Sequence, residues 1–180
     1  MKNCPFRHIA KLSDVSSLET LLDLLKFRET FLFNKLMADI KRLTPLVGAY
    51  NVLMQETSDV MQNLAQTYGE RHALEYCIEQ LSVLKNAKNQ EVMALCFQLF
   101  GADAINRDLG FYMLHGVVNT EAAKALTPKR HEIIKKVASN ALDILDCLNI
   151  PKHALYAPIA GDYVKYNSSP NYGEIVGSKL

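Results

Sequence analysis

The sequence lacks the features that characterise nucleic-acid-binding and membrane-spanning proteins. Its formal net charge is only +1 over 180 residues, too little for the basic footprint that nucleic acid or an anionic membrane would require. No apolar run is long enough to cross a bilayer. The start, Met1-Lys2-Asn3-Cys4-Pro5, has no apolar stretch of the kind found in secretory signals. We therefore expect no nucleic-acid partner and no membrane span.

Cysteine is also scarce, and its spacing excludes a clustered metal site. Cys4, Cys77, Cys96 and Cys147 lie far apart, with no Cys-x-x-Cys pair and no adjacent histidines. Structural zinc needs clustered ligands, so no metal site is expected. Three of the four sit among apolar residues at helical spacing, which predicts small buried side chains with free thiols. Free thiols fit an intracellular, reducing compartment.

Common catalytic and cofactor-binding motifs are missing as well. The chain has no glycine-rich dinucleotide or phosphate loop, no Gly-x-Ser-x-Gly turn and no Glu-x-x-His pair for a di-iron bundle. His131-Glu132 is not followed by a second histidine at the spacing that zinc proteases use. His115 follows an apolar helix end, and we expect it to cap that helix rather than to catalyse. The sequence therefore predicts no catalytic residue, no cofactor-binding residue and no metal ligand.

What the chain does contain is apolar residues at steps of three and four, the period of amphipathic helices. A first long helix is expected after the capping-box pattern Ser16-Ser17-Leu18-Glu19, ending at Pro45. A second is expected over about 48–84. Gly69 is either a weak point within that helix or a break between two helices. Met54 and Met61 on this stretch are expected to fill the core rather than to line a fatty pocket.

The second half of the chain continues the helical pattern. After a turn at 86–89, a third helix is expected over about 92–112, followed by a short capped turn at 120–126. Thr127-Pro128 is expected to open a fourth long helix, with threonine as the cap and proline at the first position. That helix is expected to stop at 149–151.

Four long amphipathic helices with short turns predict an all-α fold, an up-and-down four-helix bundle with an irregular carboxy-terminal tail. The expected organisation is an irregular segment over 1–15, a helical bundle over 16–156 and an irregular tail over 157–180. The tail ends in Ser178-Lys179-Leu180, the tripeptide that the peroxisomal import receptor reads. We therefore predict a peroxisomal location and the import receptor as a partner, with an accidental terminus as the alternative.

The order of several segments resembles that of peroxisomal acyl-CoA oxidases. Residues 105–116, with Asp108-Leu109-Gly110 and His115-Gly116, are similar to the family pattern I-x-x-D-L-G-x-x-x-x-H-G. Residues 120–126, 141–153 and 157–159 resemble the segments that follow in the family, and the terminal tripeptide is common in it. Thr127-Pro128 departs from the pattern, because the family usually continues a helix there.

The resemblance implies the carboxy-terminal helical domain of such an oxidase. Whole acyl-CoA oxidases use FAD to convert an acyl-CoA into a trans-2-enoyl-CoA, and they pass the electrons to oxygen as hydrogen peroxide. Their flavin site, acyl-CoA pocket and catalytic glutamate lie upstream of this domain. The domain itself packs against the catalytic half and supports the dimer. The expected partners are therefore the catalytic half or a second copy. FAD is expected only in the whole enzyme and not in this chain alone.

Two hypotheses follow from the sequence. The chain is either part of an acyl-CoA oxidase, present as a fragment, a truncated gene model or a separate subunit, or a standalone non-catalytic interaction protein of the peroxisome derived from such an oxidase. For the second hypothesis, the extra apolar residues Leu24, Phe27 and Phe31 on the first helix are the expected docking surface.

Overall fold

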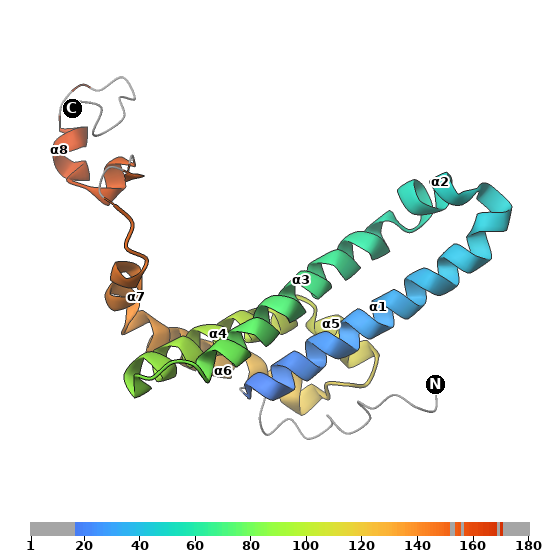
Figure 1. Cartoon of the computed structure of the whole chain (residues 1–180), viewed down its shortest axis with the longest axis horizontal. Helices are drawn as coiled ribbons and strands as arrows, with labels where there is room; N and C mark the ends of the chain where they lie inside the picture. Colours follow the sequence, from blue (N-terminus) through green and yellow to red (C-terminus); the bar gives the residue numbers. More distant parts are fainter. Residues whose placement is uncertain (1–16, 152–153, 156, 169, 171–180) are drawn as a thin grey trace. The chain divides into compact units, whose positions relative to one another are not determined.

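Long helices joined by short turns make up most of the chain in a computed structural model, which describes residues 17–151, 154–155, 157–168 and 170 (Figure 1). The described residues contain helices and no strand, so the all-α prediction is confirmed. The chain divides into two compact units, with the boundary between Ser139 and Asn140. In the described part, no helix combines the length and the apolar character needed to cross a membrane.

The N-cap of the first helix, α1 (Leu18–Val47), lies one residue after the cap position that the capping-box pattern predicts. Ser17 is the N-cap, and its hydroxyl accepts a hydrogen bond from the backbone N–H of Thr20 at 3.3 Å. Pro45 lies inside the last turn and does not end the helix as expected. The helix ends at Gly48 instead, whose φ of 81° only glycine adopts without strain and whose N–H donates to the Thr44 carbonyl.

The return arm of the hairpin is interrupted near its start rather than at Gly69. It consists of α2 (Ala49–Asn51), the π-helical segment η1 (Val52–Glu56) and α3 (Ser58–Leu81). The interruption is at Thr57, whose buried hydroxyl and backbone N–H both donate to the carbonyl of Val52, at 2.8 and 2.9 Å. Gly69 lies in uninterrupted α3, so the alternative of a break there is wrong.

The expected third helix is divided into α4 (Ala87–Arg107) and α5 (Leu109–Leu114). Asn86 caps α4, because its side chain accepts a hydrogen bond from the N–H of Asn89 at 3.2 Å. The helix therefore begins within the expected turn. The break between α4 and α5 is at Asp108, whose carboxylate forms an ion pair with Arg28 of α1.

The Thr127-Pro128 prediction is wrong, because one continuous helix, α6 (Thr120–Ala138), runs through both residues. Its cap is Asn119, whose side chain accepts a hydrogen bond from the N–H of Ala122 at 2.8 Å. Ala122, Leu126 and Ile133 are all buried, so the apolar face passes the proline without a break. An internal proline removes one backbone hydrogen bond, a loss that this packing offsets. The helix ends at Ala138, about ten residues before the expected end.

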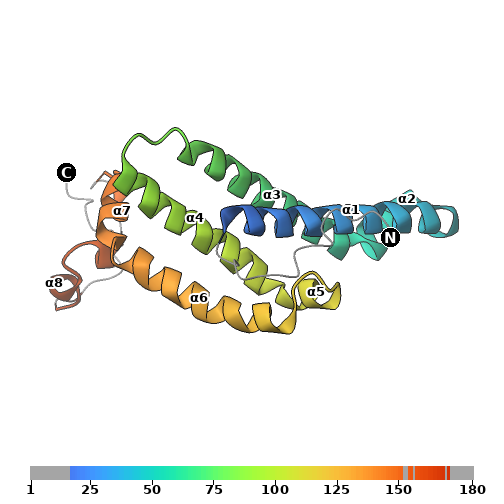
Figure 2. The ribbon, with the colours of Figure 1, turned by 90° about the horizontal axis from the view of Figure 1, so that it is seen from below.

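Within the first unit, each long helix runs antiparallel to the next (Figure 2). α1 packs against α3 and α4, and α4 also packs against α3 and α6. α4 approaches both α1 and α3 closely at Gly101, where an added Cβ would lie 3.0 Å from Leu21 of α1 and 3.2 Å from Leu74 of α3. The core gathers around this crossing and continues to α5 and α6. Its fully buried members include Leu21, Leu24, Leu25, Leu74, Ala104, Ile105 and Tyr112.

The second unit contains α7 (Ala141–Cys147), the 3₁₀ turn η3 (Pro158–Ala160) and α8 (Tyr163–Asn167). Asp162 caps α8, since its side chain accepts a hydrogen bond from the N–H of Lys165 at 3.0 Å. The described part of the segment that we expected to be irregular therefore contains two short helical elements.

Candidate functional site

A group of charged side chains, of which Arg28 and Glu70 are buried, joins three helices of the first unit. Arg28 of α1 is 5% exposed and forms an ion pair with Asp108, at the joint between α4 and α5. A second Arg28 nitrogen lies 3.9 Å from a carboxylate oxygen of Glu70 on α3. The other Glu70 oxygen accepts hydrogen bonds from Arg107, at 2.6 Å, and from Gln66, at 2.9 Å. Two positive and two negative groups thus balance, and we call these four charged residues the ionic cluster.

Tyr112 of α5 lies beside the ionic cluster and is fully buried. Burial raises the pKa of its hydroxyl well above the ordinary value, since a phenolate would lose its hydration. Asp108 and Glu70 act in the same direction, and the positive charge of Arg28 opposes them. Burial and the two carboxylates therefore both favour the neutral hydroxyl.

A tight turn joins α5 to α6, and the apolar face of α6 packs in the core. Gly116 has a φ of 66°, a left-handed conformation that favours glycine. The N–H groups of Val117 and Val118 both donate to the carbonyl of Tyr112, at 3.0 and 3.2 Å. Asn119 then caps α6. Asp108 and Gly116 of the expected family pattern therefore both act on the geometry of the α4–α5–α6 connection.

The expected docking surface on α1 is wrong, because its residues lie inside the fold. Leu24 is fully buried and Phe27 nearly so. Phe31 packs edge-on against Phe111 of α5, with ring centroids 5.3 Å apart, and against the ring of His115 at 4.1 Å. His115 does lie at the carboxy-terminal cap of α5, as expected. Its ring packs on these two aromatic rings and so joins α5 to α1.

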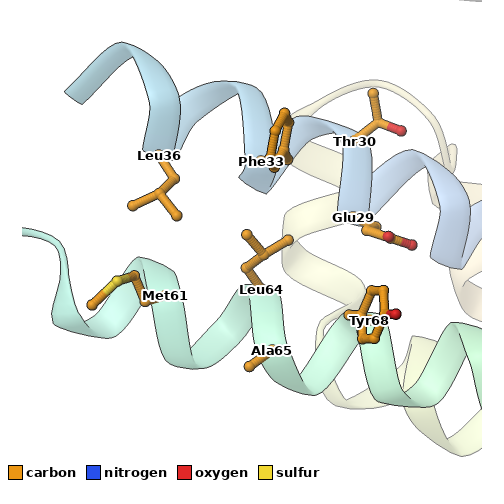
Figure 3. Close-up of a pocket in the computed structure, with 8 residues that line it drawn as sticks. All are labelled: Glu29, Thr30, Phe33, Leu36, Met61, Leu64, Ala65 and Tyr68. Atoms are coloured by element: carbon orange, nitrogen blue, oxygen red, sulfur yellow. The ribbon is translucent and has the colours of Figure 1, made fainter. Parts of the chain in front are cut away.

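The half of the α1–α3 hairpin that lies toward α2 carries a shallow apolar groove of about 540 Å³ (Figure 3). Leu36 from α1 and Leu64 from α3 point into the space between the two helices, and Met61 lies beside them. Glu29 and Tyr68 close the inner end. The lining residues are Glu29, Thr30, Phe33, Leu36, Met61, Leu64, Ala65 and Tyr68. Met61 therefore lines a groove, and Met54 is 59% exposed, so neither fills the core as expected.

A second set of ion pairs joins α1 to α3 and includes Glu29, which also lines the groove. Arg71 of α3 donates to both oxygens of Glu29 on α1, at 2.6 and 3.1 Å, and to Glu75 at 2.6 Å. The hydrogen bond to Glu29 is the main cause that raises the pKa of the Arg71 guanidinium. Lys26 of α1 reaches Glu75 at 3.1 Å. These contacts fix the two arms of the hairpin in register.

Glu75 should make the hairpin sensitive to acid. Hydrogen bonds from Lys26 and then from Arg71 hold the pKa of Glu75 below its ordinary value. A carboxyl whose pKa is lower in the folded chain stabilises it above the unfolded pKa, and this is lost as the pH falls through the folded pKa. We expect the free energy of unfolding, measured with urea, to fall below about pH 4.5. Glu75→Gln should make the free energy of unfolding depend less on pH over this range.

The remaining predicted residues are distributed without forming a site. Among the described cysteines, Cys77 and Cys96 are half-buried free thiols whose pKa values are raised by burial. Cys147 is exposed, contrary to expectation. The described residues hold no group of three or more metal-ligating side chains. Ser178, Lys179 and Leu180 of the expected import signal lie outside the described residues, as does Cys4.

Sequence reasoning missed the ionic cluster, although one signal was present. Arg28 lies within the apolar stripe of α1, next to Phe27 and one turn from Leu24 and Leu32. A charge in such a stripe is buried only with a partner. The partners Glu70 and Asp108 are 42 and 80 positions away in the sequence, so they cannot be assigned from helical spacing.

Comparison with known proteins agrees with the resemblance. A sequence model of the acyl-CoA oxidase family matches residues 17–162. Among curated proteins, the peroxisomal acyl-coenzyme A oxidase 2 of Arabidopsis thaliana is 23% identical over 156 residues, which cover 87% of this chain and 22% of that relative. The chain therefore spans about a fifth of the length of the relative it matches. No solved structure gives a significant match.

Proposed function

Because the chain belongs to the acyl-CoA oxidase family, we propose that it is the carboxy-terminal helical domain of a peroxisomal, FAD-dependent oxidase and acts through packing and dimerisation. In that setting, the whole enzyme binds FAD and converts an acyl-CoA into a trans-2-enoyl-CoA with release of hydrogen peroxide. This chain supplies helices that brace the catalytic half. It holds neither the flavin nor the acyl-CoA by itself.

The observation that supports this proposal is what the family-pattern residues do in the fold. Asp108 pairs with the buried Arg28, His115 packs between Phe31 and Phe111, and Gly116 makes the turn into α6. In the part of the chain that the structure describes, all three serve helix placement. Such roles suit a domain that supports a catalytic centre located elsewhere.

The alternative, a standalone interaction protein, depended on an exposed docking surface on α1, and that surface packs within the fold. Leu24 and Phe27 are buried in the core, and Phe31 packs against α5. We therefore prefer the domain of an oxidase.

The test is whether the purified chain carries flavin or turns over substrate. We expect no visible flavin absorbance after expression with added riboflavin, and no hydrogen peroxide when saturated acyl-CoA thioesters of several lengths are supplied. The full-length Arabidopsis relative, assayed in parallel, is the positive control. Bound flavin, or peroxide release by this chain alone, would contradict the proposal.

The terminal tripeptide is proposed as the peroxisomal import signal. A fluorescent protein fused to the amino terminus leaves Ser178-Lys179-Leu180 free, and we expect the fusion to collect in peroxisomes. Lys179→Glu places a negative charge inside the tripeptide and should leave the fusion diffuse. Lys165→Glu, outside the tripeptide, is the matched control and should still be imported. Equal import of all three fusions would show that the tripeptide is not the signal.

A further inference from the structure

Two enclosed oxygen atoms at the ionic cluster have no hydrogen-bond partner among the described residues. They are Oε2 of Glu70 and the hydroxyl oxygen of Tyr112. Glu70 is 8% exposed and Tyr112 is fully buried, so neither oxygen is in contact with bulk water. In native folds, buried polar atoms are almost always hydrogen-bonded to protein or to an ordered water. The two oxygens therefore indicate a bound group that is not a side chain of this fold.

Both oxygens lie near the guanidinium of Arg28. Nη1 of Arg28 is 3.9 Å from Oε2 of Glu70, which is too far for a direct hydrogen bond. The Tyr112 hydroxyl is close enough to Arg28 and Glu70 for the charge of each to influence its pKa. A single small molecule can bridge polar groups at such separations, because it reaches about 2.8 Å to each of them.

A group bound at this point would connect helices that the ion pairs of the cluster do not connect in the same way. Arg28 pairs with Asp108 and so joins α1 to the break between α4 and α5. Glu70 accepts from Arg107 at 2.6 Å and so joins α3 to the end of α4. A molecule held by Arg28, Glu70 and Tyr112 would add a connection among α1, α3 and α5.

The charges around the two oxygens select the chemistry of the bound group. A cation would lie against Arg28, and an anion would lie against Glu70, so a buried ion of either sign would meet a like charge. A neutral molecule that both donates and accepts hydrogen bonds fits all three residues. It would donate to the carboxylate, accept from the guanidinium and form either kind of bond with the hydroxyl. Water has this chemistry, and a buried water typically makes about three such bonds.

We propose that one water molecule is bound by Oε2 of Glu70, the guanidinium of Arg28 and the hydroxyl of Tyr112, as a constant part of the fold. Its exchange with solvent would occur where the cluster reaches the surface, since the side chains of Asp108 and Arg107 are 40% and 50% exposed. The site goes beyond the proposed function, because the three residues lie within this chain whatever larger protein contains it.

Tyr112→Phe tests the site, because it removes the hydroxyl and keeps the ring. Removal of a hydroxyl that has no partner should raise the midpoint of thermal unfolding or leave it unchanged, whereas removal of one that binds the water should lower it. We expect a fall of roughly 2–5 °C for the whole purified chain, followed by circular dichroism. Tyr76→Phe makes the same chemical change at a tyrosine of α3 that is 62% exposed, and it should shift the midpoint by about 1 °C or less.

A high-resolution crystal structure of the whole chain identifies the partner of the hydroxyl. We expect one ordered water with hydrogen bonds of about 2.6–3.2 Å to Glu70, Arg28 and Tyr112. A direct hydrogen bond between Tyr112 and Glu70 would also lower the midpoint in Tyr112→Phe, so the crystal structure separates the two explanations. That direct bond, an ion in place of the water, or a midpoint that does not fall in Tyr112→Phe would overturn the proposal.

Discussion

Replacing Arg28 with methionine is expected to lower the free energy of unfolding by about 3 kcal/mol, because it removes a buried guanidinium that pairs with Asp108 and lies beside the buried carboxylate of Glu70. Asp108 would lose its partner, and Glu70, with a side chain only 9% exposed, would keep only Arg107. Methionine has a similar length and no charge, so the loss reports electrostatics more than volume. For a chain of this size, the midpoint of thermal unfolding should fall by roughly 6–12 °C.

Two further variants make the Arg28 result specific. Arg42→Met removes a guanidinium that is 64% exposed and paired with Asp39 within α1, and it should cost less than about 0.5 kcal/mol. The double variant Arg28→Met with Asp108→Asn should be less destabilised than the sum of the two single variants, because each residue alone leaves the other uncompensated. Additive effects would show that the two residues act independently, contrary to the structure.

Gly101→Val should be the other large effect, at about 2–3 kcal/mol of lost stability. An alanine Cβ at this position would already lie 3.0 Å from Leu21 and 3.2 Å from Leu74, and valine adds two methyl groups. The neighbours are fully buried side chains on two other helices, so relief requires that α1, α3 or α4 move. Urea unfolding, monitored by circular dichroism, measures the loss.

Gly69→Val is the matched control for Gly101→Val. Gly69 also lies within a long helix, but no heavy atom would lie within 4 Å of an added Cβ. Valine is a slightly better helix former than glycine, so this variant should be neutral or more stable by a few tenths of a kcal/mol. A large loss at Gly69, or none at Gly101, would place the helix crossing elsewhere.

The family pattern around Asp108 illustrates how far sequence reasoning reached. The helical period correctly predicted long helices on both sides of it, and the resemblance identified it as a family feature. Neither the helical period nor the resemblance predicted that Asp108 would divide the helix or that Asp108 would pair with Arg28. Pairing over 80 positions depends on which helix faces meet, and a periodic pattern within one helix contains no such information.

The two prolines inside helices also show where prediction from local sequence fails. Local rules predicted that Pro45 would end α1 and that Thr127-Pro128 would begin a helix, because proline lacks an N–H and disfavours helix interiors. In the fold, α6 instead continues through Pro128, since the buried face of Ala122, Leu126 and Ile133 offsets the lost hydrogen bond. The helix ends are set by Gly48, whose φ is positive, and by the Asn119 cap.

The sequence by itself determined the all-α class, the approximate extent of the long helices and the family, because hydrophobic period and motif order are local properties of the chain. Tertiary structure alone decided which apolar residues are buried and which are exposed. Leu24 and Phe33 have similar side chains on the same helix, yet the first is enclosed by other helices and the second is half exposed. Burial depends on neighbours brought together by folding, and for that reason the sequence could not show that Leu24 and Phe27 are buried and not available as a docking surface.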